Sequence, residues 1–153
     1  MATPFFLNNT FRLNSVISRT FILLLAQNGP RSFLSGNKID LRKALKDYNR
    51  NEFHHIHPRS FLKGAKKSNI DDSCLANICF LSRTDNNIIS GSAPSAYRKK
   101  LSEDIQELEE ANFLPPSTWE DNFEKFAEDR SVLLTAYAAQ LLNGGAVSKR
   151  KTS

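Results

Sequence analysis

The apolar residues of this chain are divided among short segments, and this restricts what it can fold into. The longest apolar run without a charge is Phe21–Ala26, far shorter than the roughly 20 residues that a membrane-spanning helix needs. The 153 residues are 40% hydrophobic and 24% charged, which is typical of one globular domain and excludes a disordered tail, a collagen-like fibre and a coiled coil. Eleven Phe against one Trp and one Met predict a core of Phe and Leu.

The same segment and the cysteines indicate a cytoplasmic protein without a membrane partner. Phe21–Ala26 lies late for a secretory signal, lacks a small-residue cleavage site and runs into a Gln-Asn-Gly-Pro turn. The two cysteines, Cys74 and Cys79, are too few for a disulfide framework, which agrees with a reducing compartment.

Hydrophobic periodicity predicts an α+β domain. An apolar stripe from Leu13 to Leu25 predicts a helix that ends near Asn28-Gly29-Pro30. The other expected elements are a short helix capped by Asp40 through Leu45, a break at Asn49–Asn51, an extended segment Glu52–Ile56, a loop over 58–76 with one helical turn at Ser60–Lys63, a strand Ile78–Leu81, a helical turn from Arg83, an acidic helix over Leu101–Leu108 that stops before Pro115, and a C-terminal helix. We expect Ser117 and Glu120 to form a capping box for that last helix. Its apolar face is predicted to hold Trp119, Phe123, Phe126, Leu133, Tyr137 and Leu141, and its end to lie at Gly144-Gly145.

Charge is distributed unevenly along the chain. Residues 38–100 hold 13 basic and 6 acidic residues, a net charge of +7, whereas residues 101–130 hold 2 basic and 10 acidic residues, a net charge of −8. A polyanion would therefore meet the middle of the chain. Taken alone, this asymmetry fits equally a basic loop region beside a solvated acidic helix.

All three histidines lie within four residues, His54, His55 and His57. In an extended segment the side chains of His54 and His55 point in opposite directions. Neutral imidazole binds metals and moves protons near neutral pH, so one histidine can bind a metal while its neighbour acts as a base. The alternative is a polar strand edge with surface histidines.

An asparagine-rich segment follows the histidines. Asn77 lies 22 positions after His55, and Asn86 lies 9 positions after Asn77. If the two predicted strands pair, a helical turn from Arg83 would project Asn86 towards His54. An amide oxygen is a hard, neutral ligand that suits Mg²⁺. The structural alternatives are a turn residue for Asn77, which we expect to hold the histidine loop, and a helix N-terminus for the run from Asp85.

As an ordered set, these residues resemble the ββα-metal nucleases of the HNH superfamily. The set is His54-His55-Ile56-His57-Pro58, then Ala76-Asn77-Ile78, then Leu81-Ser82 and Asn86. The similarity is closest to the C-terminal nuclease domain of GmrSD-type (type IV) modification-dependent restriction enzymes, and it spans roughly residues 13–143. Flanking similarities include Tyr97 and a C-terminal helix with Phe126 and Arg130.

The resemblance implies an α+β fold with a ββα-metal core, and a role for each motif residue. His54 would be the first metal ligand, His55 the general base, Asn77 the residue that holds the loop orienting His55, and Asn86 the second metal ligand. The role of His57 is open, because that position varies in the family. One divalent ion is expected, Mg²⁺ first. Many relatives carry Asp where this chain has His54, and the loss of that negative charge leaves Mn²⁺ or Zn²⁺ as alternatives.

The implied reaction is hydrolysis of DNA phosphodiester bonds, in restriction or defence. The basic residues expected to contact backbone phosphates are Arg59, Lys63, Lys66, Lys67 and Arg83. The alternatives are a non-catalytic nucleic-acid-binding module, or a zinc-stabilised structural domain in which His54 and His57 join Cys74 and Cys79.

The organisation expected is one HNH-like domain over residues 12–143 with its core about 49–100, preceded by a segment 1–11 and followed by a basic tail 144–153. Similar proteins carry a large nucleotide-dependent N-terminal domain, whereas no phosphate-binding loop of the Gly-x4-Gly-Lys type occurs in this sequence. A stand-alone nuclease, a subunit that works with a separate nucleotide-dependent partner, and a chain that lacks its N-terminal domain therefore remain alternatives.

Overall fold

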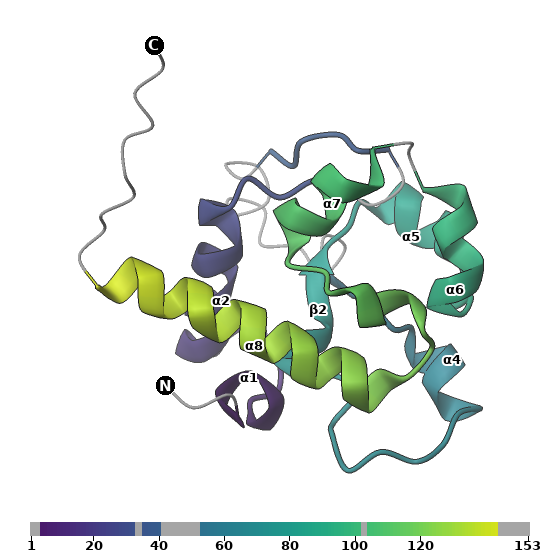
Figure 1. Cartoon of the computed structure of the whole chain (residues 1–153), viewed down its shortest axis with the longest axis horizontal. Helices are drawn as coiled ribbons and strands as arrows, with labels where there is room; N and C mark the ends of the chain where they lie inside the picture. The colour runs from purple at the N-terminus through teal and green to yellow at the C-terminus, as the bar shows by residue number, and fades with distance from the viewer. Residues whose placement is uncertain (1–3, 33–34, 41–52, 102–103, 144–153) are drawn as a thin grey trace.

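The computed structural model describes residues 4–32, 35–40, 53–101 and 104–143. They form a mixed α+β structure in which helices surround a small sheet (Figure 1). The elements are α1 (Pro4–Asn8), α2 (Val16–Gln27), β1 (Phe53–His55), α4 (Arg59–Lys63), the 3₁₀ helix η2 (Leu75–Asn77), β2 (Ile78–Phe80), α5 (Arg83–Ile89), α6 (Pro94–Tyr97), η3 (Arg98–Lys100), α7 (Ile105–Asn112), η4 (Pro116–Trp119) and α8 (Phe123–Leu142).

The sheet consists of β1 and β2, which pair antiparallel. Phe53 lies opposite Phe80, and their rings pack with centroids 4.9 Å apart. Every residue of β2 is buried, as expected for a short apolar strand at the centre of a small core. Both predicted strands are confirmed, and so is the helical turn predicted in the loop between them, which is α4.

The N-terminal helices cover one end of the core. Ser15 caps α2 by accepting a hydrogen bond from the Ser18 backbone N–H, and Gly29 takes the positive φ of 62° just beyond the helix end. The helix predicted from the Leu13–Leu25 stripe is therefore confirmed. Helix α1 was not predicted, and it lies in the segment assigned to precede the domain. Its Phe6 is buried in the same core cluster as Phe21 of α2.

The C-terminal half differs from the expectation at one junction. The acidic helix is present as α7, but it begins at Ile105, so Leu101 lies outside it. The capping box expected at Ser117 is wrong. The side chain that caps α8 is Asn122, which accepts from the Lys125 N–H. Ser117 instead lies within η4, and Glu120 follows it. Pro115 and Pro116 favour this tight turn, so α8 begins later than expected.

The predicted apolar face of α8 is also partly wrong. Phe123 and Phe126 are buried as expected, but Leu133 is 40% exposed. The buried stripe continues through Arg130 and Leu134, which lie four and eight positions after Phe126. Helix α8 crosses the sheet and packs on α1 and η2 (Figure 1), so it reaches the segment that leads into β2.

Some expectations fall on residues outside the described ranges. These are the helix after Asp40 through Leu45, the break at Asn49–Asn51, the stop at Gly144-Gly145 and the basic tail. Within the described ranges, no helix has both the length and the hydrophobicity needed to cross a bilayer.

Candidate nuclease site

The histidine pair lies on β1. His54 is opposite Cys79 and His55 is opposite Ile78, and both histidine side chains are half-buried. Burial is the largest influence on the pKa of His55 and lowers it below the ordinary value, although the carboxylate of Asp72 acts in the opposite direction. The His55 imidazole is therefore neutral at pH 7, which is the state that a proton acceptor needs.

Asn77 holds the ends of the loop that joins the two strands. Its side-chain oxygen accepts from the His57 backbone N–H at 2.8 Å, and its amide nitrogen donates to the carbonyl oxygens of His57 (3.0 Å) and Asp72 (2.7 Å). The side chain is fully buried. All these bonds are to backbone groups, so Asn77 fixes the main chain just after His55, as the expectation of a loop-holding residue requires.

Two side chains from later elements also bind this backbone. The Tyr97 hydroxyl, at the end of α6, donates to the Ile56 carbonyl at 2.6 Å. The Arg130 guanidinium, from α8, donates to the carbonyls of Ala76 (2.8 Å) and Ile78 (2.7 Å), on either side of Asn77, and to that of Asn112 (3.1 Å).

Arg130 is a buried cation that binds carbonyl oxygens and makes no ion pair with any described carboxylate. It is 0% exposed, and burial lowers the pKa of Arg130 to about 10. From the sequence, Arg130 was expected only as a flanking similarity, without this role. The available signal was its spacing of four residues from Phe126, which places it on the buried face.

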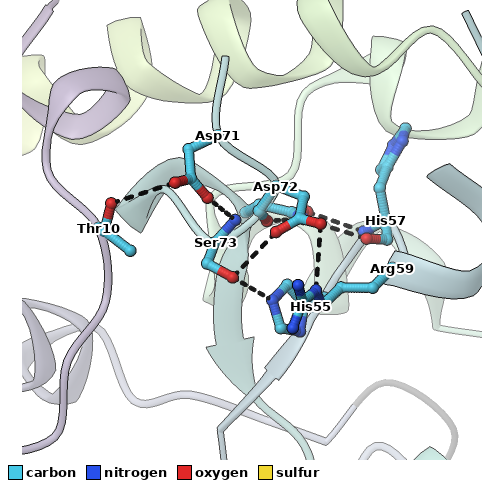
Figure 2. Close-up of polar contacts among 8 residues, drawn as sticks. Thr10, His55, His57, Arg59, Asp71, Asp72 and Ser73 are labelled. Atoms are coloured by element: carbon cyan, nitrogen blue, oxygen red, sulfur yellow. Dashed lines mark hydrogen bonds and ion pairs between the residues drawn. The ribbon is translucent and has the colours of Figure 1, made fainter. Parts of the chain in front are cut away.

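His57 is a core residue. Its ring stacks on Phe126 at a centroid distance of 4.3 Å, and its Nε2 donates to the Thr118 carbonyl at 3.0 Å. The ring points away from His55 (Figure 2). It is fully buried, and burial lowers the pKa of His57 to about 4. The role that the sequence left open is thus packing between the histidine loop and α8.

The pKa of His57 predicts a pH dependence of folding. The unfolded chain binds this proton near pH 6.5 and the folded chain near pH 4, so the stability is complete above pH 6.5 and decreases as the pH falls to 4. The total loss expected is about 3 kcal/mol. Urea unfolding at pH 7 and pH 5 should show about 2 kcal/mol of this loss, because pH 5 still lies above the pKa of the folded state. The difference should shrink in His57→Gln, and an equal difference in that variant would contradict the assignment.

Asn86 lies on α5, which is separated from the end of β2 by two residues. Ser82 caps this helix by accepting from the Asp85 N–H, and the Asp85 carboxylate accepts hydrogen bonds from Ser32 and Ser35. Asn86 is half-buried, and no described residue hydrogen-bonds to its side-chain amide. The predicted helical turn is confirmed, and the Asn86 amide is available for a ligand.

The predicted phosphate-binding residues lie in two places. All three predicted lysines line one surface hollow of about 250 Å³. Its lining residues are Leu62, Lys63, Lys66, Lys67, Ser68, Ile70, Asp72 and Phe123. Arg83 is exposed at the start of α5. Arg59 is exposed as well, but its Nε donates to the Asp72 carboxylate at 3.1 Å. The structure thus brings Lys63, Lys66 and Lys67 together and places Arg83 on a separate element.

The described residues give no support to the zinc-stabilised alternative. Within the described residues, no three His, Cys, Asp or Glu side chains form a group that could hold a metal ion. Burial raises the pKa of Cys74 to about 11 and that of Cys79 to about 12, so both are protonated thiols when no metal is bound. The Nε2 of His57 is occupied by its hydrogen bond to the Thr118 carbonyl, whereas its buried Nδ1 has no hydrogen-bond partner among the described residues. A pair of one imidazole and one amide, such as His54 with Asn86, is a different kind of site, on which this finding does not bear.

A chain of polar contacts reaches His55 from the loop. His55 Nε2 lies 3.0 Å from Ser73 Oγ, and Ser73 Oγ donates to Asp72 Oδ1 at 3.0 Å (Figure 2). Asp72 Oδ2 accepts from Arg59 Nε. Ser73 and Asp72 were not among the predicted site residues, because the contact of Ser73 with His55 depends on how the loop folds back.

Comparisons with known proteins add no relative. No protein-family model matches the chain, and no curated protein or solved structure is significantly similar to it.

Proposed function

We propose that this chain is a metal-dependent endonuclease that hydrolyses phosphodiester bonds of DNA with a ββα unit of the HNH type. The observation that carries the proposal is the order of elements around the histidine pair. His54 and His55 lie on β1, Asn77 ties the loop that follows, and β2 leads within two residues into α5, which bears Asn86. The similarity of these motifs to GmrSD-type enzymes supports a role in restriction or defence.

In this proposal His55 accepts the proton of the attacking water. Its neutral imidazole, its half-burial and the fixed backbone beside it suit that role. A positioned general base contributes about 10²–10⁴-fold to the rate. Asn77 and Arg130 act on the main chain around His55 and not on the substrate.

His54 and Asn86 would hold the divalent ion, Mg²⁺ first, with Mn²⁺ or Zn²⁺ as alternatives. The donor chemistry fits, because the imidazole nitrogen of His54 and the amide oxygen of Asn86 are both neutral ligands of such ions. When bound, the ion supplies positive charge beside the scissile phosphate. With two neutral protein ligands, its affinity without DNA is expected to be low.

A plasmid-cleavage assay tests the proposal. Supercoiled plasmid should be nicked or linearised with Mg²⁺ or Mn²⁺, and EDTA should abolish the reaction. DNA binding without cleavage in any of Mg²⁺, Mn²⁺ and Zn²⁺ would favour the alternative of a non-catalytic nucleic-acid-binding module. Modified and unmodified plasmids assayed in parallel then test the restriction role.

The Asn86→Ala variant should lose at least about 10-fold in cleavage, because even residues that only support metal ligands are worth about that much. Raised Mn²⁺ should restore part of the activity. The matched control is Asn87→Ala, the exposed neighbour on the same helix, which should keep full activity. Calorimetry in the presence of DNA measures the metal affinity, and unchanged affinity in Asn86→Ala would exclude Asn86 as a ligand.

The lysine hollow predicts a salt dependence of DNA binding. Each phosphate contact contributes about −0.9 to the slope of log affinity against log salt. Replacing Lys66 and Lys67 together by Ala should therefore weaken binding to all sequences alike and reduce the slope by up to about two units. The same measurement on a Lys99→Ala, Lys100→Ala double variant gives the comparison. A changed slope only in that second variant would place the DNA along η3 instead.

A further inference from the structure

The contacts of His55 determine which of its two ring nitrogens carries the proton. Ser73 Oγ is 3.0 Å from His55 Nε2 and 3.0 Å from Asp72 Oδ1. A serine hydroxyl has one hydrogen to donate and can also accept. The direction of both hydrogen bonds therefore depends on which of its two neighbours takes that hydrogen.

Asp72 takes it. The Asp72 carboxylate also accepts from Arg59 Nε at 3.1 Å, and an ionised carboxylate can only accept. The Ser73 hydrogen then points to Asp72, and the oxygen lone pair of Ser73 faces His55 Nε2. A contact of 3.0 Å between that lone pair and Nε2 is a hydrogen bond only when Nε2 is the donor.

We propose that Ser73 and Asp72 are positioning residues that hold His55 in the tautomer with the proton on Nε2, and so leave Nδ1 as the nitrogen that accepts the proton from water. No described residue hydrogen-bonds to Nδ1. The use of Nδ1 as a base rests on the proposed nuclease function, whereas the tautomer is a property of the protein without substrate.

The positions of Ser73 and Asp72 are fixed by bonds that do not involve His55. The Asp72 carbonyl accepts from the Asn77 side chain at 2.7 Å, and the Ser73 backbone N–H donates to Asp71 Oδ1 at 2.7 Å. Figure 2 shows these residues on the turn that faces β1. The hydrogen bonds of Asn77 therefore orient His55 indirectly, because they fix the turn from which Ser73 contacts the His55 ring.

Nitrogen NMR of the ¹⁵N-labelled protein, above the usual histidine pKa of about 6.5, tests the tautomer without metal or DNA. A His55→Gln sample identifies the His55 signals. The wild type should show a protonated Nε2 and an unprotonated Nδ1. In Asp72→Asn the new amide group can donate to Ser73, which frees the hydroxyl to donate to Nε2, so the proton should move to Nδ1.

Asp71→Asn is the matched control, because it removes the same charge one residue away and keeps an oxygen that can accept from the Ser73 N–H. Its His55 spectrum should equal that of the wild type. Ser73→Ala should lose the protected Nε2–H signal, and Ser73→Thr should retain it. A proton on Nδ1 in the wild type, or a spectrum unchanged in both Asp72→Asn and Ser73→Ala, would overturn the proposal.

Cleavage kinetics then separate the two proposals. In an active wild type, Ser73→Ala should lower kcat by up to about 10²-fold with KM little changed, because it disturbs the base and not DNA binding. Ser73→Thr should restore most of kcat. If the wild type has the expected tautomer but cleaves no DNA, the positioning of His55 stands and the nuclease function fails. An active wild type with equal kcat in Ser73→Ala overturns the positioning role alone.

Discussion

The His55→Ala variant is expected to lose DNA cleavage by about 10²–10⁴-fold, the contribution of a general base, while it keeps its fold and its metal affinity. The side chain is half-buried and its contacts are polar, so its removal creates little cavity. Single-turnover cleavage of a plasmid measures the loss. Circular dichroism and urea unfolding check that the variant is folded.

His54→Ala is the matched comparison, because it removes the neighbouring imidazole of the same strand. It should lose cleavage through weaker metal binding, so a higher metal concentration should recover part of its activity. The loss in His55→Ala should not respond to metal. A folded His55→Ala variant with wild-type activity would end the assignment of His55 as the base.

Arg130→Met should lower the free energy of unfolding by about 3–5 kcal/mol. Methionine fills much of the same volume but leaves the carbonyls of Ala76, Ile78 and Asn112 without their donor. Each buried acceptor that loses its partner costs about 1–3 kcal/mol, and breaking a buried charged interaction from one side costs about 3–5 kcal/mol. Urea unfolding at pH 7 measures the change.

Val132→Ala is the control for this prediction, since Val132 lies two positions along α8 and is 54% exposed. Its stability should change by less than about 0.5 kcal/mol. Arg130→Lys keeps the charge but cannot present several fixed donors at once, so it should lie between the wild type and Arg130→Met. Equal stability of Arg130→Met and the wild type would show that the carbonyls find other partners.

The local elements around the site could be predicted because their signals are local. The strand over Ile78–Phe80 follows from an apolar run, and α5 agrees with the helical turn expected from Arg83. Asn77 could be predicted as the residue that holds the loop, because buried asparagines in turns bind backbone groups. The strand and the helix depend on spacing within a few residues, whereas Asn77 reaches His57 across 20 positions.

The remaining features depend on contacts between distant segments, which periodicity does not encode. The hydrogen bond from Arg130 to Ala76 spans 54 positions, and that from His57 to Thr118 spans 61. The order of Pro115-Pro116 before α8 also overrode the capping signal at Ser117. Ser73 and Asp72 were missed for the same reason, since only the folded loop brings them to His55.

During synthesis, the hydrogen bonds of Arg130 to Ala76 and Ile78 can form only after α8 has been made. A chain that has emerged from the ribosome only as far as η4 already contains the histidine pair, Asn77 and Asn86. It lacks Arg130, whose guanidinium ties the carbonyls of Ala76 and Ile78 to α8. Such long-range contacts form only after the later segment is available. The backbone around the candidate site therefore gains these contacts only once α8 has been made, and a chain that stops before α8 would carry the histidine pair without them.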